Sequence, residues 1–316
     1  MKQLIKILLI ISFVMVIGKA NAQQLPLYSQ YMWSDYVINP AFTGSTSYSP
    51  VRLSYRKQWV GFNGSPETMF IGGYTSLDSN RIGLGGMIFK DATGGAITQS
   101  GVLLNYAYRV RFNSNNNLSL GIGGMFNQYT FDNDAVQALD ANDVALQAGK
   151  QRSFAPDVSF GVLFQSKQKL KIGLAVNQLI QSKLTKLDRI TLANRLIRHY
   201  NASASYNFEL NKNFELEPSL LFKATAVTPI QADINAKLQY KKLLWLGLSY
   251  RTSDAVVAML GLNYKNIFLG YSYDATISAM RNYTSGSHEI VVGYNFVKGK
   301  KVKKEIEEKE KTPDSK

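Results

Sequence analysis

Few residues in this sequence have the types and spacing that catalysis or metal binding requires. The two histidines, His199 and His288, stand far apart in the chain, and there is no cysteine. Histidine or thiolate metal sites need several such ligands at short spacing. Glu289 follows His288 and could form an acid–base pair with it, but neighbours on a strand point to opposite faces and no hydrolase motif accompanies them. The sequence therefore predicts no catalytic residue.

Two other patterns could in principle bind ligands. The glycine runs at 83–86 and 121–124 resemble phosphate-binding loops, but neither opens a helix, so we interpret them as glycines that ease strand curvature. Four aspartates in one predicted loop could hold calcium, namely Asp132, Asp134, Asp140 and Asp143. Their spacing departs from the calcium-loop template, because Val136 falls at a ligand position and no glycine follows. We interpret them as an acidic surface loop and expect no metal and no cofactor.

The chain begins with the features of an export signal. Lys2 and Lys6 precede an apolar run from Ile7 to Ile17, and the motif Ala20-Asn21-Ala22 follows. This pattern predicts a signal peptide over residues 1–22 that is cleaved after export begins. The run is too short to cross a membrane as a helix, and no later run approaches the required length. The processed protein is therefore expected in an outer compartment.

Alternation of apolar and polar residues dominates the chain after the leader. Between Tyr200 and Leu210, every second residue is apolar and every intervening residue is polar. This period of two places alternate side chains on opposite faces of a strand. We count about 14 such segments, which predict an all-β protein whose strands begin near Val51, Thr68, Ile82, Thr98, Leu118, Ser153, Leu170, His199, Phe214, Gln231, Leu244, Ala255, Ile267 and His288.

A soluble antiparallel sheet with one wet face can show the same alternation. Two features favour the membrane instead. Most segments have about 8 to 13 residues, close to the about 10 that a tilted strand needs to cross a bilayer. Aromatic residues lie toward the segment ends on the apolar side, as in the girdles at the two membrane interfaces of a barrel.

The lengths of the connections supply a third argument. Long connections, including 91–97, 131–152 and 178–198, alternate with short ones such as 241–242; the short link at 253–254 is an exception. Long outside loops and tight periplasmic turns produce this alternation in outer-membrane barrels. We therefore predict a transmembrane antiparallel β-barrel of about 14 strands over residues 49–296, located in the cell outer membrane.

The polar side of the strands and the two flanks complete the predicted organisation. Residues 23–48 lack the strand pattern and contain turn signals, so they could lie in the periplasm or enter the lumen as a plug. Residues 297–316 are predicted to form a charged periplasmic tail. A hydrated or salt-bridged lumen is predicted from the charged residues of the polar side, namely Arg109, Arg111, Lys171, Glu209, Glu217, Lys223, Asp233, Lys237, Arg251 and Glu289.

The net charge of +14 could indicate a nucleic-acid partner. The basic residues are spread over the strands and the tail without a clustered face. Attraction to anionic outer-leaflet lipid or a charge network in the lumen is therefore the simpler interpretation, and no nucleic acid is expected. One predicted outside loop is different, since residues 56–66 combine cationic, aromatic and glycine positions. Trp and Arg dominate interface hot spots, so this loop is either a protein-binding anchor or an interfacial anchor for the barrel.

Several motifs in order along residues 23–296 carry a resemblance to a known family. They are Gln30-Tyr31-Met32, Ile38-Asn39-Pro40-Ala41, Arg56-x-Gln58-Trp59-x-Gly61, Gly64-x-Pro66, Arg198-His199-Tyr200, Pro218-Ser219-Leu220-Leu221, Gln231-x-Asp233-x-Asn235, Gly270-Tyr271-Ser272-Tyr273-Asp274 and Gly286-Ser287-His288-Glu289-Ile290. With these motifs the chain resembles the PorP/SprF membrane proteins of the type IX secretion system of Bacteroidetes. The charged extension beyond Phe296 departs from the expected end of such a protein.

The resemblance implies a non-enzymatic outer-membrane barrel that supports secretion or surface attachment of cargo adhesins at the cell surface and, in gliding species, motility. Its implied partners are other type IX secretion components, the secreted adhesin, outer-membrane lipid and a periplasmic or peptidoglycan-associated protein. A passive porin or small-solute channel is the alternative. The candidate partner-binding residues are Asn39, Pro40, Arg56, Gln58, Trp59, Gly61 and Pro66.

Overall fold

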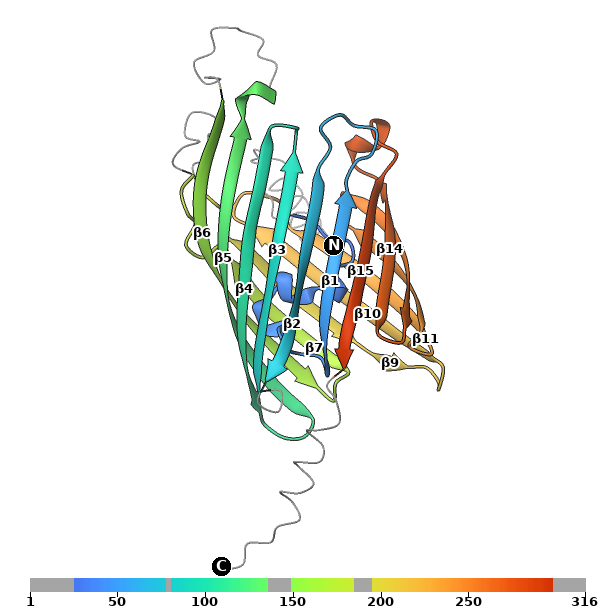
Figure 1. Ribbon diagram of the computed structural model, residues 1–316. Coiled ribbons are helices and arrows are strands. Elements are labelled where there is room, and N and C mark those ends of the chain that lie inside the picture. Colours follow the sequence, from blue (N-terminus) through green and yellow to red (C-terminus); the bar gives the residue numbers. More distant parts are fainter. Residues whose placement is uncertain (1–25, 78–80, 136–148, 185–194, 298–316) are drawn as a thin grey trace, which may run out of the picture.

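In the computed structural model, antiparallel strands close into a barrel around a short N-terminal segment (Figure 1). The structure describes residues 26–77, 81–135, 149–184 and 195–297. The predicted signal peptide, the acidic residues Asp140 and Asp143, and the tail beyond residue 297 lie outside these described residues.

Fourteen strands form the ring within the described part of the chain, and the two-residue β9 continues the line of β8 beside β10. Their number and starting points confirm the prediction of about 14 strands that was made from the alternation of apolar and polar residues. The strands are β1 (Tyr48–Lys57), β2 (Glu67–Leu77), β3 (Ile82–Thr93), β4 (Ile97–Arg111), β5 (Asn116–Asp132), β6 (Lys150–Ser166), β7 (Leu170–Asn177), β8 (His199–Tyr206), β9 (Phe208–Glu209), β10 (Phe214–Thr225), β11 (Gln231–Tyr240), β12 (Leu244–Arg251), β13 (Ala255–Tyr264), β14 (Ile267–Thr276) and β15 (Ser287–Val297).

Apart from β9, which pairs only with β10, each strand pairs with the next one along the chain, and the ring closes where β1 meets β15. That seam runs from the pair Tyr48 and Val297 to the pair Lys57 and His288. A closed ring leaves no row of unpaired backbone groups along a sheet edge, which is the condition for a sheet in lipid. No helix of the described residues is long and apolar enough to cross a membrane.

The two faces of the sheet differ as the alternation predicts. On β12, Leu246 and Leu248 are 61% and 63% exposed, whereas Ser249 and Arg251, at positions of the opposite parity, are buried inside the barrel. Leucine exposed to this extent on many strands is unfavourable in water and favourable against lipid tails. Exposed aromatic rings gather near the strand ends at the short turns, including Tyr108, Phe112, Phe208, Tyr264, Tyr294 and Phe296, and form one girdle.

Long and short connections lie at opposite ends of the barrel (Figure 1). One predicted long loop, 91–97, is instead a tight turn, because Thr93 pairs directly with Ile97. Gly94 and Gly95 in this three-residue connection both have positive φ angles, which glycine adopts without strain. The strands β3 and β4 therefore extend further than their alternation indicated.

The N-terminal segment, residues 26–47, lies inside the barrel, and its short turns are visible between the front strands of Figure 1. It contains three single turns of 3₁₀ helix, η1 (Tyr31–Trp33), η2 (Asp35–Val37) and η3 (Pro40–Phe42). Two further turns lie in the loops, η4 (Asn133–Ala135) and η6 (Ala279–Asn282). We call residues 26–47 the luminal segment.

Candidate functional site: the luminal segment and its anchors

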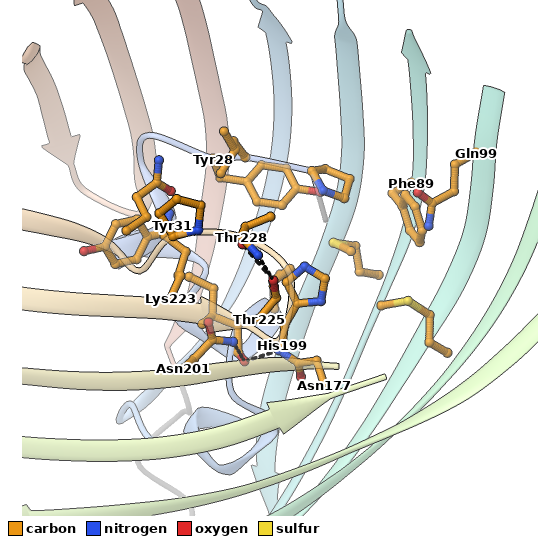
Figure 2. Close-up of a pocket in the computed structure, with 18 residues that line it drawn as sticks. Tyr28, Tyr31, Phe89, Gln99, Asn177, His199, Asn201, Lys223, Thr225 and Thr228 are labelled. Atoms are coloured by element: carbon orange, nitrogen blue, oxygen red, sulfur yellow. Dashed lines mark hydrogen bonds between the residues drawn. The ribbon is translucent and has the colours of Figure 1, made fainter. Parts of the chain in front are cut away.

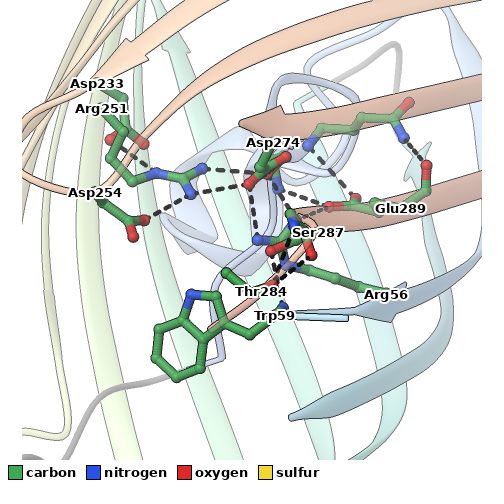
Figure 3. A network of polar contacts seen from close by, with 12 residues as sticks. Arg56, Trp59, Asp233, Arg251, Asp254, Asp274, Thr284, Ser287 and Glu289 are labelled. Carbon is green, nitrogen blue, oxygen red and sulfur yellow. Dashed lines mark hydrogen bonds and ion pairs between the residues drawn. The ribbon is translucent and has the colours of Figure 1, made fainter. Parts of the chain in front are cut away.

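Ser29 of the luminal segment is held by charged side chains of four strands, which Figure 3 labels. Its backbone N–H donates to Glu289 Oε2 at 2.7 Å, and its hydroxyl lies 2.7 Å from Asp274 Oδ2. Arg56 Nη1 donates to the same hydroxyl at 2.8 Å, and Arg56 Nη2 forms an ion pair with Asp274 at 2.8 Å. Arg251 Nη2 also donates to this hydroxyl, at 3.2 Å. These charge-assisted bonds fix the start of the segment against β1, β12, β14 and β15.

The ion pairs continue along the wall to β12, β11 and β10. Arg251 contacts Asp274 at 3.3 Å, Asp254 at 3.1 Å and Asp233 at 3.3 Å, and Lys223 pairs with Asp233 at 3.0 Å. Buried charges persist only when they are paired, since each alone would pay a large desolvation cost. We call this set the charge network; it consists of Arg56, Lys223, Asp233, Arg251, Asp254, Asp274 and Glu289. The predicted salt-bridged lumen is thus present.

The second half of the segment rests on glycines. Side chains added to Gly83 on β3, Gly121 on β5 or Gly161 on β6 would overlap the segment between Asn39 and Thr43. The overlap at Gly83 and Gly121 involves the segment's backbone, which cannot move aside by changing a rotamer. We call these three positions the glycine seat. They allow the chain to lie directly on the inner surface of the barrel.

Amide side chains complete the hold on this half. Asn39 Nδ2 donates to the carbonyl of Val162 at 3.1 Å and to that of Leu174 at 3.2 Å, while its Oδ1 accepts from Ala41 N and caps η3. Asn105 Nδ2 on β4 donates to the carbonyl of Tyr36 at 2.8 Å. The bonds to Tyr36 and Ala41 satisfy buried backbone groups of the short turns, and the bonds from Asn39 to Val162 and Leu174 attach the segment to β6 and β7.

Aromatic rings fill the space between the two halves. Trp33 lies 5.1 Å from Trp245 and 4.8 Å from Phe268, measured between ring centroids. Lys237 Nζ lies 4.4 Å from the centre of the Trp33 ring, and Arg52 lies at the same distance over Phe268. The cations gain attraction from the ring faces while they remain inside the barrel.

Asp35 is the one acidic residue of the luminal segment. Desolvation in the lumen raises the pKa of its carboxyl to about 7, although nearby Lys171 favours the charged form. Asp35 also lines a small space of about 60 Å³ together with Lys171, Ser203 and Glu217.

The loop after β1 lies directly beyond the charge network. Trp59 N donates to Ser287 Oγ at 3.1 Å, and Val60 N donates to the carbonyl of Gly286 at 2.8 Å. These bonds extend the β1–β15 ladder past its last pair, so the loop and Arg56 are rigidly connected (Figure 3). Phe62 and Tyr283 are 46% and 68% exposed beside it.

The structure distributes the seven predicted site residues between two places. Asn39 and Pro40 of the luminal segment are buried in the lumen, and Arg56 is only 1% exposed in the charge network. Gln58 is buried at the base of the loop, where its N–H donates to the carbonyl of Pro66 at 2.9 Å. The remaining three lie on the loop: Trp59 and Pro66 are half-buried, and Gly61 is exposed.

Sequence reasoning did not identify the glycine seat or the role of Ser29. The glycines had been assigned to strand curvature, yet Gly83 and Gly121 lie at inward-facing positions of their strands, where a polar side chain is otherwise expected. Glycine at these inward-facing positions was the signal in the sequence that could have identified the seat. The sequence around Ser29 gave no signal of its role, since its partners Asp274 and Glu289 are more than 200 residues away in the chain.

The sequence matches one known protein family over most of its length. The family model described as type IX secretion system membrane protein PorP/SprF matches residues 20–294. The chain belongs to this family. The match spans the luminal segment and the barrel from β1 into β15, so the barrel and its anchored segment are features of a PorP/SprF protein.

Solved structures show the same kind of fold at low identity. The toluene transporter TbuX of Ralstonia pickettii superposes with a TM-score of 0.53 and 9% identity, over 84% of this chain and 94% of that chain. The CymD monoaromatic hydrocarbon channel gives a TM-score of 0.49 and 11% identity, over 88% and 95% of the two chains. No curated protein matches the sequence. TbuX supports the outer-membrane barrel fold alone.

Proposed function

We propose that this protein is a non-enzymatic outer-membrane component of type IX secretion that supports the secretion or surface attachment of cargo adhesins and, in a gliding cell, motility. Membership of the PorP/SprF family carries the proposal. The buried charged residues, which would be the candidates for acid–base chemistry, are engaged with one another and with Ser29. Their geometry suits a structural role.

In this proposal the loop with Trp59 faces outward and contacts the exported adhesin. Trp59, Phe62 and Tyr283 offer aromatic surface of the kind that dominates protein interfaces. Arg56 contributes indirectly, because it connects the base of this loop to the luminal segment. Periplasmic secretion components are proposed to engage the opposite end, where the short turns lie.

Alanine substitutions on the loop and at Arg56, the buried residue that connects the loop base to the luminal segment, test the proposal. Trp59→Ala and Arg56→Ala are each expected to lower the amount of adhesin on the cell surface, measured by immunofluorescence on intact cells. Tyr264→Ala is the matched control, since Tyr264 is an exposed aromatic residue at the end with the short turns. Heat-modifiable migration in gels establishes that each barrel assembles. Unchanged adhesin display in both loop variants would refute the docking role.

The alternative, a passive small-solute channel, has one observation in its favour, the polar lumen. The luminal segment crosses that lumen and is anchored at both halves. Conductance of the purified protein in planar bilayers separates the two: steady ion flow through the intact barrel is the expectation of the channel, and its absence is the expectation of the docking role.

A further inference from the structure

A cavity lies between the luminal segment and the barrel wall, on the side of the long loops (Figure 2). The space, counted together with the solvent to which it opens, is about 970 Å³. Tyr28 and Ile38 of the segment line it, and residues of β3, β4, β5, β7, β8, β10 and β11 form its walls. The cavity itself, without that open solvent, has a volume of about 110 Å³.

One wall of the cavity is apolar. Phe89 and Met87 come from β3 and Met125 from β5, and Tyr28 and Tyr31 of the luminal segment lie across from them. Methionine sulfur and aromatic edges make favourable contacts with a ring of a ligand. This wall therefore suits a flat ring better than a charged or strongly hydrated group.

His199 on the other wall presents a hydrogen-bond acceptor. Its Nδ1 lies 2.8 Å from the carbonyl oxygen of Ile197, which can only accept, so Nδ1 carries the proton. Nε2 of the neutral ring is then an acceptor, and it is buried without a hydrogen-bond partner. A group that donates a hydrogen bond would satisfy it.

Gln99 on β4 presents the complementary group. Its side chain is more than nine-tenths buried and lines the cavity, and its Nε2 has no hydrogen-bond partner. An amide nitrogen can only donate. Lys223 is the one charged residue among those lining the cavity, and it is already paired with Asp233 at 3.0 Å.

We propose that this cavity binds a small neutral ring compound that carries a hydroxyl group, such as a phenol or an aromatic alcohol. The hydroxyl donates to His199 Nε2, an oxygen elsewhere on the ligand accepts from Gln99 Nε2, and the ring lies against Phe89, Met87 and Met125. A pure hydrocarbon lacks the donor for His199, and so does an ionised carboxylate. The proposal does not depend on the secretion role.

The photoreactive phenol 4-hydroxybenzophenone is a direct probe. It combines two rings, a hydroxyl donor and a ketone acceptor, and on illumination it inserts into nearby C–H bonds. The full-length protein in lipid nanodiscs is illuminated with the probe at a pH at which the phenol is neutral. Peptide mass spectrometry is expected to find the label on the peptides with Met87 or Met125. Benzophenone, which lacks the hydroxyl, is expected to label them much less.

Two variants and a matched control sharpen the test. His199→Asn keeps a donor toward the Ile197 carbonyl but removes the Nε2 acceptor, and Gln99→Leu removes the amide donor. Each is expected to lower labelling of the cavity by about tenfold, the ordinary effect of one lost buried hydrogen bond. Ser203→Ala is the control, because Ser203 shares β8 with His199 but lines the other, smaller space.

Three results would overturn the proposal, provided that each barrel shows normal heat-modifiable migration. They are label spread over the lipid-facing residues without enrichment in the cavity, equal labelling by benzophenone, and unchanged labelling in both His199→Asn and Gln99→Leu. If one variant fails to assemble, the other still decides, since the two side chains belong to different strands.

Discussion

The two halves of the luminal segment are held by different physics. Ser29 is held by buried charges, with Arg56, Asp274 and Glu289 within hydrogen-bond distance of it or of one another. Residues 39–43 are held by close fit, since three glycines leave room for the chain and Asn39 donates to two wall carbonyls.

Because of this difference, the two halves of the luminal segment are sensitive to different kinds of substitution. A buried ion pair is costly to form and becomes strongly unfavourable when one partner is lost, so the charged half depends on every member of its set. The seated half depends on the absence of side chains, so any added atom at the seat displaces the segment. Substitutions on the barrel wall can therefore release one half and leave the other in place.

The largest effect is expected from Gly121→Ala. The added methyl group would overlap the backbone of Pro40 and Ala41, so residues 39–43 must leave the wall, with a cost of about 4 kcal/mol or more. Hydrogen exchange of peptides over residues 37–47, followed by mass spectrometry, is expected to become fast. Gly124→Ala on the same strand is the control, because its methyl group meets only the Phe126 ring at 3.8 Å. Equal exchange in both variants would contradict the seat.

A smaller effect is expected from Arg56→Met. The substitution leaves Glu289 buried without its cation, while Arg251 still neutralises Asp274, so the charged half should lose about 3 kcal/mol. Faster hydrogen exchange over residues 27–33 is the measurement, with residues 37–47 unchanged. Lys212→Met removes the same charge from an exposed turn and should change neither. If both halves of the segment loosen together in Arg56→Met, the comparison fails.

The smallest effect is expected from pH acting on Asp35. Its pKa in the folded protein, about 7, lies above the ordinary value of 3.8, so the folded state favours the protonated carboxyl. The resulting stabilisation is present below about pH 4 and declines as the pH rises through about 7. Lys171 and Lys237 oppose the shift and Glu217 supports it. Water reaches this half-buried group, so about 1 kcal/mol is expected.

Exchange of residues 31–38, corrected for the intrinsic effect of pH, measures this dependence. The segment should be protected better at about pH 5 than at about pH 8. Asp35→Asn cannot titrate and should abolish the difference. A pH dependence that persists in Asp35→Asn must come from another group.

The strands could be predicted from the sequence because lipid outside and a polar lumen inside impose a strict period of two. The starts of β3, β7, β8, β10, β11, β12, β13 and β14 were obtained in this way, at Ile82, Leu170, His199, Phe214, Gln231, Leu244, Ala255 and Ile267. The place of residues 23–48 could not be decided, since turn signals are the same in water and in a lumen. The partners of Arg56 could not be predicted either, because they lie across the seam from it or on β14.

That seam has a consequence for biogenesis. Arg56 belongs to the first strand and Glu289 to the last, and Ser29 is bonded to both. The luminal segment, which is translated before the strands, can thus form its final contacts only after the C-terminal hairpin has paired with β1 and closed the barrel. A barrel caught with its first and last strands apart would keep its amino terminus loose, so protease sensitivity of that terminus would report completion of assembly.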